Sequence, residues 1–389
     1  MKKNEMRILA LLLTLALAIA CLAGCSSGKA ETAETTAAGS AATTAAGSAA
    51  TTAAGERKCK VGVVNTGTAE TMAWTRAHKE GIDYLKEKMP DLDVVWVEDV
   101  ADSGPDCGTV IDELVNEGCN LIFTTSYGFM QATQEAAKKY PNVLFFHNQS
   151  TTYGDNLGVY DVRDYEAVFL TGYLAERVSK GNFLGYVGTN PMPTVIRAAN
   201  AFALGAKYAN SDVKMQAVFT NSWYDVTAEK EAALALIDSG AKALGMQVSS
   251  PAVVQASQER GIYSVGFSDD MHDYAPKSVL CSFKWNWGPL YLYMVQSFID
   301  GTLTKGEDLF FGLDKGCGGI TAYNKDLVSD DIAKDCDALF EKLKSGDVKV
   351  FYGAIKDNTG KTHGTADKDL PSEDIRSMDW LVDFMSGKV

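Results

Sequence analysis

The chain has 389 residues, and its 50 acidic and 36 basic side chains give a formal net charge of −14. A surface this acidic argues against nucleic acid and anionic lipid as electrostatic partners. Hydrophobic residues make up 46% of the chain, so it has enough apolar side chains for cores of ordinary size.

The first residues predict a signal peptide. Three cations and one anion within Lys2–Arg7 precede an apolar run from Ile8 to Ala23, which is too short to span a bilayer permanently. The run ends in Leu-Ala-Gly-Cys, which resembles the lipobox of bacterial lipoproteins. We therefore expect cleavage after residue 24 and lipidation of Cys25 with acyl chains such as palmitate. The alternative is an ordinary signal peptide with an incidental cysteine.

Residues 25–57 are predicted to be a flexible tether. From Thr35 to Gly55 the sequence TTAAGSAA repeats with a period of eight and has no apolar side chain larger than alanine. Such a segment cannot bury enough surface to offset its ordering entropy. A weak Ala-rich helix is the alternative, but the recurring Gly and Thr residues disfavour it. The lipid and the tether together predict a protein anchored to the cell membrane and facing the extracellular or periplasmic side.

Short apolar strands alternate with amphipathic helices along the rest of the chain. The first series has strands at 59–64, 93–97, 121–124 and 143–146, with helices at 72–88, 109–117 and 131–139. The second series has strands at 183–187, 214–219, 244–247, 263–266 and 279–283, with helices at 195–209, 228–239 and 253–259. Two such series predict two α/β lobes, each with a parallel sheet covered on both faces. Helices at 290–300 and 332–345 follow.

We expect lobe I to comprise 58–165 with a return segment at about 288–320. Lobe II is expected to comprise 166–287 with a C-terminal segment at about 321–389. Ligands of open parallel sheets bind beyond the carboxyl ends of the strands, so the cleft between the lobes is the expected site. The loops that follow the strands carry Trp74, Trp223, Trp285 and many hydrogen-bonding groups. A flat ligand held between two indole rings fits that set of side chains.

Five stretches resemble one family of proteins. They are IFTTSYGFMQATQEAAKKYPNVLFFH (122–147), NPMPTVIRAANAFALGA (190–206), SPAVVQASQERGIYSVGFSDDM (250–271), WNWGP (285–289) and MDWLV (378–382). With them, residues 60–389 resemble the basic membrane protein family of lipoprotein substrate-binding components of ABC transporters, relatives of the purine nucleoside receptors. The resemblance implies a type I periplasmic-binding-protein fold, with two Rossmann-like lobes joined by a hinge and closing on a purine. It also implies an ABC permease as partner, and we expect a monomer.

The resemblance also implies ligand-binding residues. Trp74, seven residues before Gly81, matches one stacking aromatic of the family, and Trp223 in Trp223-Tyr224-Asp225 matches a second. The acidic pair that follows a Gly in the family corresponds to Gly266-Phe267-Ser268-Asp269-Asp270, where Ser268 replaces the acid that grips ribose. The family's Asp after the fourth strand is matched by His147 or Asn148, and its later Lys falls near Lys284 or Trp285. The full predicted set is Thr66, Gly67, Trp74, Tyr127, Gly128, Phe129, Asn190, Trp223, Asp225, Ser249, Asp270, Trp285 and Asn286.

The lost ribose ligands favour a free nucleobase, adenine-like, over a nucleoside. A sugar or autoinducer receptor of the same fold is the alternative, although more carboxylates and amides per aromatic would then be expected. The motifs of serine hydrolases, Walker NTPases, zinc peptidases and dinucleotide enzymes are absent, so we expect no catalysis and no cofactor. His78 and His363 are expected to be solvated. The six cysteines after Cys25 form no CxxC motif, so no metal site is predicted.

Overall fold

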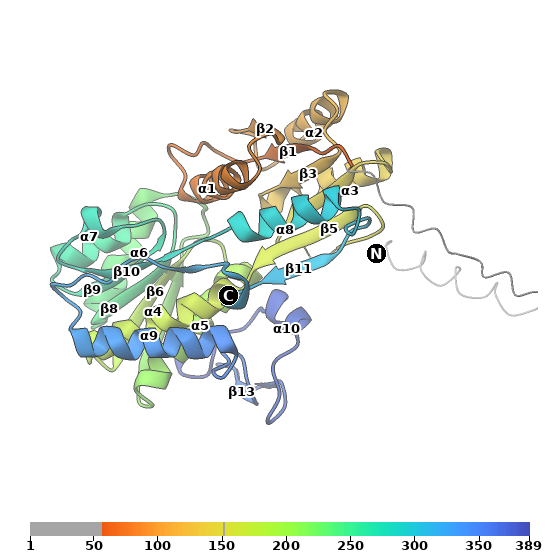
Figure 1. The fold of residues 1–389 in the computed structure, drawn as a ribbon. Helices are drawn as coiled ribbons and strands as arrows, with labels where there is room; N and C mark the ends of the chain where they lie inside the picture. The colour runs from red at the N-terminus through yellow and green to blue at the C-terminus, as the bar shows by residue number, and fades with distance from the viewer. Residues whose placement is uncertain (1–56, 151) are drawn as a thin grey trace, which may run out of the picture. The chain divides into compact units, whose positions relative to one another are not determined.

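The computed structural model describes residues 57–150 and 152–389. The predicted signal peptide, Cys25 and the predicted tether up to residue 56 lie outside these residues. Two α/β lobes make up the described part (Figure 1). No helix within 57–150 or 152–389 combines the length and the apolar character needed to cross a lipid bilayer.

Lobe I is built on a six-stranded sheet with the order β2-β1-β3-β4-β5-β11, in which every pairing is parallel. Helices α1 and α8 cover one face and α2 and α3 the other, and each face has its own apolar cluster. The strands are β1 (Lys60–Val64), β2 (Asp93–Val97), β3 (Leu121–Thr124), β4 (Leu144–Asn148), β5 (Leu157–Val162) and β11 (Asp308–Phe311). The helices are α1 (Ala73–Lys88), α2 (Asp106–Asn116), α3 (Met130–Lys139) and α8 (Gly288–Ile299).

Lobe II is built on a seven-stranded sheet with the order β12-β10-β9-β8-β6-β7-β15, in which only β12 is antiparallel. The strands are β6 (Phe183–Gly188), β7 (Lys214–Phe219), β8 (Ala243–Gln247), β9 (Tyr263–Ser268), β10 (Val279–Lys284), β12 (Gly319–Ile320) and β15 (Met385–Ser386). The helices are α4 (Asp164–Ser179), α5 (Pro193–Ala209), α6 (Val226–Asp238), α7 (Ala252–Glu259) and α9 (Asp330–Ser345). Near the C-terminus, β13 (Ile355–Lys356) pairs with β14 (Thr362–His363), and α10 (Ser372–Arg376) contacts α5.

Five consecutive strands follow the same order in both sheets, β2-β1-β3-β4-β5 and β7-β6-β8-β9-β10. The chain passes between the lobes three times, between β5 and α4, between β10 and α8, and between β11 and β12. Two details differ from the expected bounds. Helix α4 begins two residues before the predicted start of lobe II at 166, and β12 pairs with β10, so the return segment to lobe I ends before 320.

Several elements were not predicted, and the longest of them are β5 and helix α4. Twelve of the sixteen residues of α4 are buried. A helix that is buried on nearly all sides has no polar stripe, so its sequence lacks the 3.6-residue alternation by which surface helices are recognised. Strand β5 is buried along its whole length and follows a polar loop, so it likewise shows no alternation.

A buried ion cluster lies where the chain first passes between the lobes. The Arg197 guanidinium on α5 donates from Nε to Asp164 Oδ1 (2.9 Å) and from an Nη to Asp161 Oδ2 (2.8 Å). All three side chains are 2% exposed or less. Burial raises the pKa of Asp164 to about 6, while the neighbouring Arg197 acts to lower it. Removing Arg197 would leave two buried carboxyl groups without their cation, so the cluster fixes this connection tightly.

Helices α4 and α5 approach closely because each has a glycine at the contact. A Cβ built on Gly172 would lie 1.9 Å from the Phe202 carbonyl oxygen, and one on Gly205 would lie 1.8 Å from that of Phe169. These neighbours are backbone atoms, which cannot move aside without separating the helices. The interior of lobe II therefore depends on these two residues.

Gly172→Ala is expected to destabilise the protein by about 1 to 3 kcal/mol through overpacking. Gly108→Ala is the matched control, because Gly108 is also helical but has nothing within 4 Å of its built Cβ. The control should be neutral or stabilising by up to about 1 kcal/mol, the gain in helix propensity. Thermal unfolding of both variants followed by circular dichroism tests this, and equal melting temperatures would contradict the close-contact argument.

Candidate ligand-binding site

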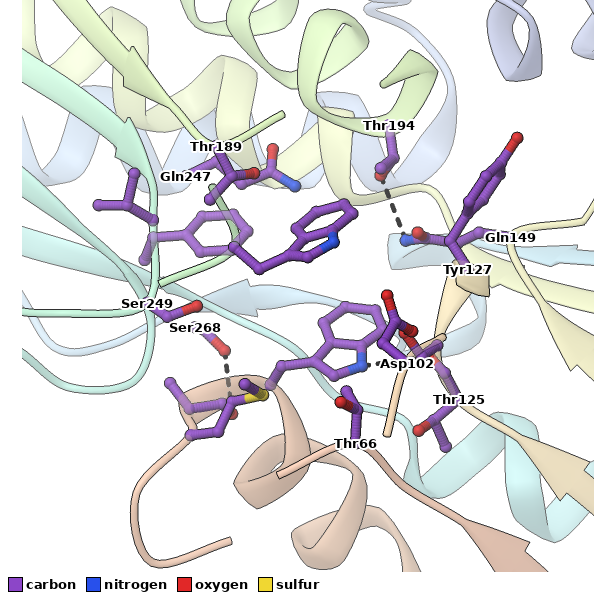
Figure 2. A pocket seen from close by; sticks show the side chains of 17 residues that line it. Thr66, Asp102, Thr125, Tyr127, Gln149, Thr189, Thr194, Gln247, Ser249 and Ser268 are labelled. Carbon is purple, nitrogen blue, oxygen red and sulfur yellow. Dashed lines mark hydrogen bonds between the residues drawn. The ribbon is translucent and has the colours of Figure 1, made fainter. Parts of the chain in front are cut away.

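A cavity of about 750 Å³, counted with the open solvent at its mouth, lies between the two lobes (Figure 2). Lobe I contributes Thr66, Met72, Ala73, Trp74, Asp102, Thr125, Ser126, Tyr127 and Gln149 to its lining. Lobe II contributes Thr189, Thr194, Trp223, Gln247, Val248, Ser249, Phe267 and Ser268.

The lining residues lie at or just beyond the carboxyl ends of strands, or at the start of the helix that follows. Thr66 and Thr125 follow β1 and β3, and Thr189 and Gln247 lie at the ends of β6 and β8. In each sheet these strand pairs are the point where the strand order reverses, which is where open α/β sheets bind ligands. The point where the strand order reverses therefore lies at the same cavity in both sheets.

Trp74, on the first turn of α1, is held from several sides. Its Nε1 donates to the carbonyl oxygen of Thr125 (3.1 Å). Its ring meets the edges of three others at centroid distances of 4.7 Å to His78, 5.4 Å to Trp285 and 5.7 Å to Trp287. Edge-to-face contacts of this kind are favourable and directional. The Trp74 indole is thus fixed in orientation before any ligand arrives.

Trp223 is positioned more loosely, from the loop between β7 and α6. It is 39% exposed, and its neighbour Tyr224 is 52% exposed. The Asp225 carboxylate accepts hydrogen bonds from the backbone N–H groups of Thr227 and Ala228 and so caps α6. This cap fixes the far end of the loop that carries Trp223, while the indole itself keeps much of its freedom.

Among the lining residues there is no Lys, Arg or His, and the single charged side chain is Asp102. The remaining polar groups are hydroxyls and the amides of Gln149 and Gln247. Gln247 is 7% exposed, and its Oε1 has no partner among the described residues. Gln149 and Ser268 have positive φ values of 59° and 70°, which is uncommon for residues with a side chain. Such strain concentrates at binding sites.

Polar contacts join the lobes around the cavity. The Arg76 guanidinium on α1 contacts Asp269 Oδ2 through Nε (3.0 Å) and Nη2 (2.9 Å), and Lys284 Nζ lies 3.0 Å from Glu80 Oε2. Ser268 Oγ donates to the carbonyl oxygen of Ala73 (3.2 Å). The side chains of both ion pairs are partly exposed, so each pair is worth little individually. Together they hold the two lobes against each other in this conformation.

Five of the thirteen predicted residues line the cavity, namely Thr66, Trp74, Tyr127, Trp223 and Ser249. The others lie elsewhere. Phe129 is 1% exposed in the core of lobe I, Trp285 is 2% exposed behind Trp74, and Asp225 caps α6. Asp270 is exposed and accepts from the backbone N–H of His272, while the exposed Asn286 donates to the carbonyl oxygen of Gly316. Gly67 and Asn190 are in loops beside the cavity and Gly128 is in the short 3-10 helix Tyr127–Phe129, but none of the three lines the cavity.

Asp102, Gln149, Thr189, Thr194 and Gln247 line the cavity but lie outside the strand-end loops considered in the sequence. The signal for Asp102 and Gln149 was available, because they follow the second and fourth strands. The rule that ligand groups follow parallel strands applies to those strands as well. Which strand-end residues turn inward, however, depends on loop conformation.

The expectation that His78 and His363 are solvated was wrong. His78 is fully buried, stacks on Trp287 at a centroid distance of 4.4 Å, and its Nδ1 lies 2.8 Å from the Tyr291 hydroxyl. His363 stacks on Trp380 (4.1 Å) and its Nε2 lies 2.7 Å from Asp357 Oδ2. Both predictions failed because the sequence around a single His does not show which residues pack against it. Across the described residues, no group of His, Cys, Asp and Glu has the arrangement of a metal site.

Comparison with known proteins identifies the family. Residues 58–352 match the family described as ABC transporter substrate-binding protein PnrA-like. The chain belongs to this family. The resemblance noted in the sequence is thereby confirmed, and the protein is a substrate-binding protein of an ABC transporter, with a small-molecule ligand and a permease as its partners.

This binding protein is 32% identical to a purine-binding protein of Brucella abortus over 86% of this chain and 95% of the relative. It is 28% identical to a Haloferax volcanii protein provisionally named as the glucose-binding protein of an ABC transporter, over 73% of this chain and 71% of the relative. A solute-binding protein of an ABC transporter system from Conexibacter woesei has a similar fold, with a TM-score of 0.63 and 22% identity, covering 75% of this chain and 98% of the other. The predicted type I periplasmic-binding-protein fold is thus confirmed.

The buried histidines predict acid sensitivity. Burial lowers the pKa of His78 to about 3 and that of His147 to about 4. Because an unfolded histidine titrates near 6.5, the unfolded chain takes up these protons first. Burying these histidines in the neutral form therefore stabilises the fold fully above a pH of about 6.5. This stabilisation is lost as the pH falls toward the pKa values of the two histidines in the folded protein. The slope is at most ~1.4 kcal/mol per pH unit for each histidine.

His78→Gln should accordingly lose less stability between pH 7 and pH 5 than the unchanged chain does. His272→Gln, in a partly exposed turn, is the control and should keep the original slope. Urea unfolding at several pH values measures both, and parallel curves for all three proteins would rule out the histidine origin.

Proposed function

We propose that this protein binds a neutral purine nucleobase in the cavity between its lobes and delivers it to an ABC permease. The observation that carries this proposal is that one indole from each lobe, Trp74 and Trp223, lines a cavity that has no cationic side chain. Indole faces suit planar heterocycles, and each stacking contact is worth about 1 to 3 kcal/mol. The Brucella abortus relative, named as purine-binding, supports the same ligand class.

The charge of the lining narrows the ligand class further. Nucleotides, sugar acids and amino acids carry a phosphate or carboxylate, and burying such an anion without a cation is costly. The one charged lining residue, Asp102, would repel these anions as well. The cavity therefore favours neutral ligands that offer hydrogen-bond donors.

A free base fits better than a nucleoside. The ribose-gripping acid of the related nucleoside receptors is matched by Ser268, whose hydroxyl donates to the Ala73 carbonyl oxygen across the lobes. The two other acidic residues of that segment, Asp269 and Asp270, do not line the cavity. Asp269 pairs with Arg76 instead. No carboxylate in this segment is left to bind ribose hydroxyls.

A sugar is the second candidate, because the Haloferax volcanii relative is provisionally named for glucose. Sugar hydroxyls are usually bound by several carboxylates and amides at once. One carboxylate and two amides line this cavity, together with two indoles and the side chains of Met72, Val248 and Phe267. This apolar balance favours a flat, weakly hydrated ring.

In the proposed mechanism no covalent bond changes. The ligand enters while the lobes are apart and contacts both of them. It favours closure because only the closed form offers both stacking faces and the Arg76–Asp269 and Lys284–Glu80 pairs. The closed monomer then docks on the permease, where reopening releases the ligand unchanged.

Isothermal titration of the full-length chain in detergent tests the proposal with nucleobases, nucleosides and sugars. Nucleobases should bind, and Trp74→Ala and Trp223→Ala should each weaken binding by about 1 to 3 kcal/mol. Tyr224→Ala is the control, since Tyr224 is exposed beside Trp223 and does not line the cavity. Binding of pentoses or hexoses alone would refute the purine assignment, and unchanged affinity in both tryptophan variants would refute the sandwich.

We further propose that the mature chain is anchored outside the cytoplasmic membrane by acyl chains on Cys25, with residues 25–57 as the tether. More than one acyl chain is needed for durable anchoring, at about 0.8 kcal/mol per buried methylene. Metabolic labelling with a palmitate analogue should mark the chain, and Cys25→Ser should abolish the label and release the protein from membranes. A labelled Cys25→Ser variant would contradict the assignment of the lipid site.

A further inference from the structure

Asp102 stands apart from the other lining residues because it is the one charged side chain at the cavity. It lies in the loop between β2 and α2, and Figure 2 shows its carboxylate directed into the cavity beside Thr66 and Gln149. It was not among the predicted site residues, although it follows the second strand. An acidic side chain with no cation among its fellow lining residues requires an explanation.

Two neighbours hold this carboxylate in place. The Ser126 hydroxyl donates a hydrogen bond to Asp102 Oδ1. Gly128 provides the space, because a Cβ built there would lie 2.1 Å from the Asp102 carbonyl oxygen and 2.6 Å from its Cγ. Any larger residue at 128 would displace the loop. Gly128 was predicted to contact the ligand itself. It instead leaves the space that Asp102 occupies.

The carboxylate is only partly satisfied by the protein. Among the described residues no donor is within hydrogen-bonding distance of its Oδ2, and the nearby Trp74 Nε1 donates to Thr125 rather than to Asp102. A carboxylate offers about four acceptor positions, and Ser126 occupies one. The remaining positions face a cavity from which other charges are absent, so the ligand itself is the natural source of donors.

We propose that Asp102 determines which purine binds, by accepting two adjacent N–H groups from the edge of the base. This inference rests on the proposed function. Guanine presents such a pair, the ring N1–H and the exocyclic 2-amino group, with the parallel geometry that a carboxylate accepts in bidentate fashion. Hypoxanthine has N1–H but no 2-amino group. Adenine presents the N1 lone pair at this edge, which a carboxylate repels. The proposed preference is therefore for guanine and differs from the adenine-like base expected from the sequence.

Comparing the affinities of four bases distinguishes hydrogen bonding to Asp102 from stacking alone. Guanine and hypoxanthine differ only by the 2-amino group, and so do 2,6-diaminopurine and adenine. The 2-amino group should strengthen binding about tenfold or more when N1–H stands beside it, since a hydrogen bond to a charged group is worth about 1.5 to 3 kcal/mol. It should change binding less than about threefold when N1 is a lone pair, because the paired geometry is then lost.

The experiment measures dissociation constants of the four bases for the full-length chain and for Asp102→Asn by quenching of tryptophan fluorescence. Asp102→Asn keeps the shape but replaces one acceptor with a donor, so the advantage of guanine over hypoxanthine should disappear while stacking remains. Asp106→Asn removes an exposed charge four residues away that does not line the cavity, and it should keep that advantage.

Equal binding of guanine and hypoxanthine by the unchanged chain, or an advantage that survives in Asp102→Asn, would overturn the role of Asp102 and leave the purine assignment intact. An absence of binding for all four bases would instead overturn the proposed function. Circular dichroism of the Asp102→Asn variant establishes that the loop substitution leaves the fold unchanged.

Discussion

The site depends on the packing of aromatic rings around Trp74. Trp285 and Trp287 stack on each other with centroids 5.1 Å apart, and both make edge-to-face contacts with Trp74. They lie in the segment that carries the chain from β10 of lobe II to α8 of lobe I. The wall of the cavity and one connection between the lobes are therefore a single packed unit.

The connections between the lobes are packed more firmly than the polar contacts that join the lobes elsewhere. Trp285 and Trp287 are almost fully buried, so the connection they occupy is fixed at the level of side-chain packing. The Arg197 cluster fixes another connection by charge, since its partners Asp161 and Asp164 flank the passage from β5 to α4. The contacts across the cavity mouth, such as Arg76 with Asp269, are partly exposed and individually weak. Opening of the lobes would break these weaker contacts and spare the buried ones.

The two indoles that line the cavity differ in how firmly the protein holds them. Trp74 is held by several partners and offers a face of fixed orientation, which lowers the entropy that a ligand must give up on binding. Trp223 is 39% exposed on a loop whose far end is capped by Asp225. A firmly packed face on one lobe and a more exposed face on the other suit the proposed closure of the site on its ligand.

The amino-acid sequence predicts the fold class correctly, because strand and helix periodicities are local properties of the chain. The strands at 93–97, 121–124 and 214–219 were predicted with the bounds that the structure has. It also determined that binding groups gather at strand ends, where Thr66, Tyr127 and Ser249 line the cavity. Helix α4 escaped prediction because its burial on nearly all sides removes the polar stripe.

Which strand-end side chains face the cavity depends on the tertiary structure. Trp74 and Trp285 look alike in the sequence, yet one lines the cavity and the other lies behind it, because the second belongs to a segment between the lobes whose path depends on distant contacts. Likewise, Asp270 points to solvent while Asp102 enters the cavity beside Ser126. Side-chain direction in a loop is set by neighbours far away in the chain, and no local pattern encodes them.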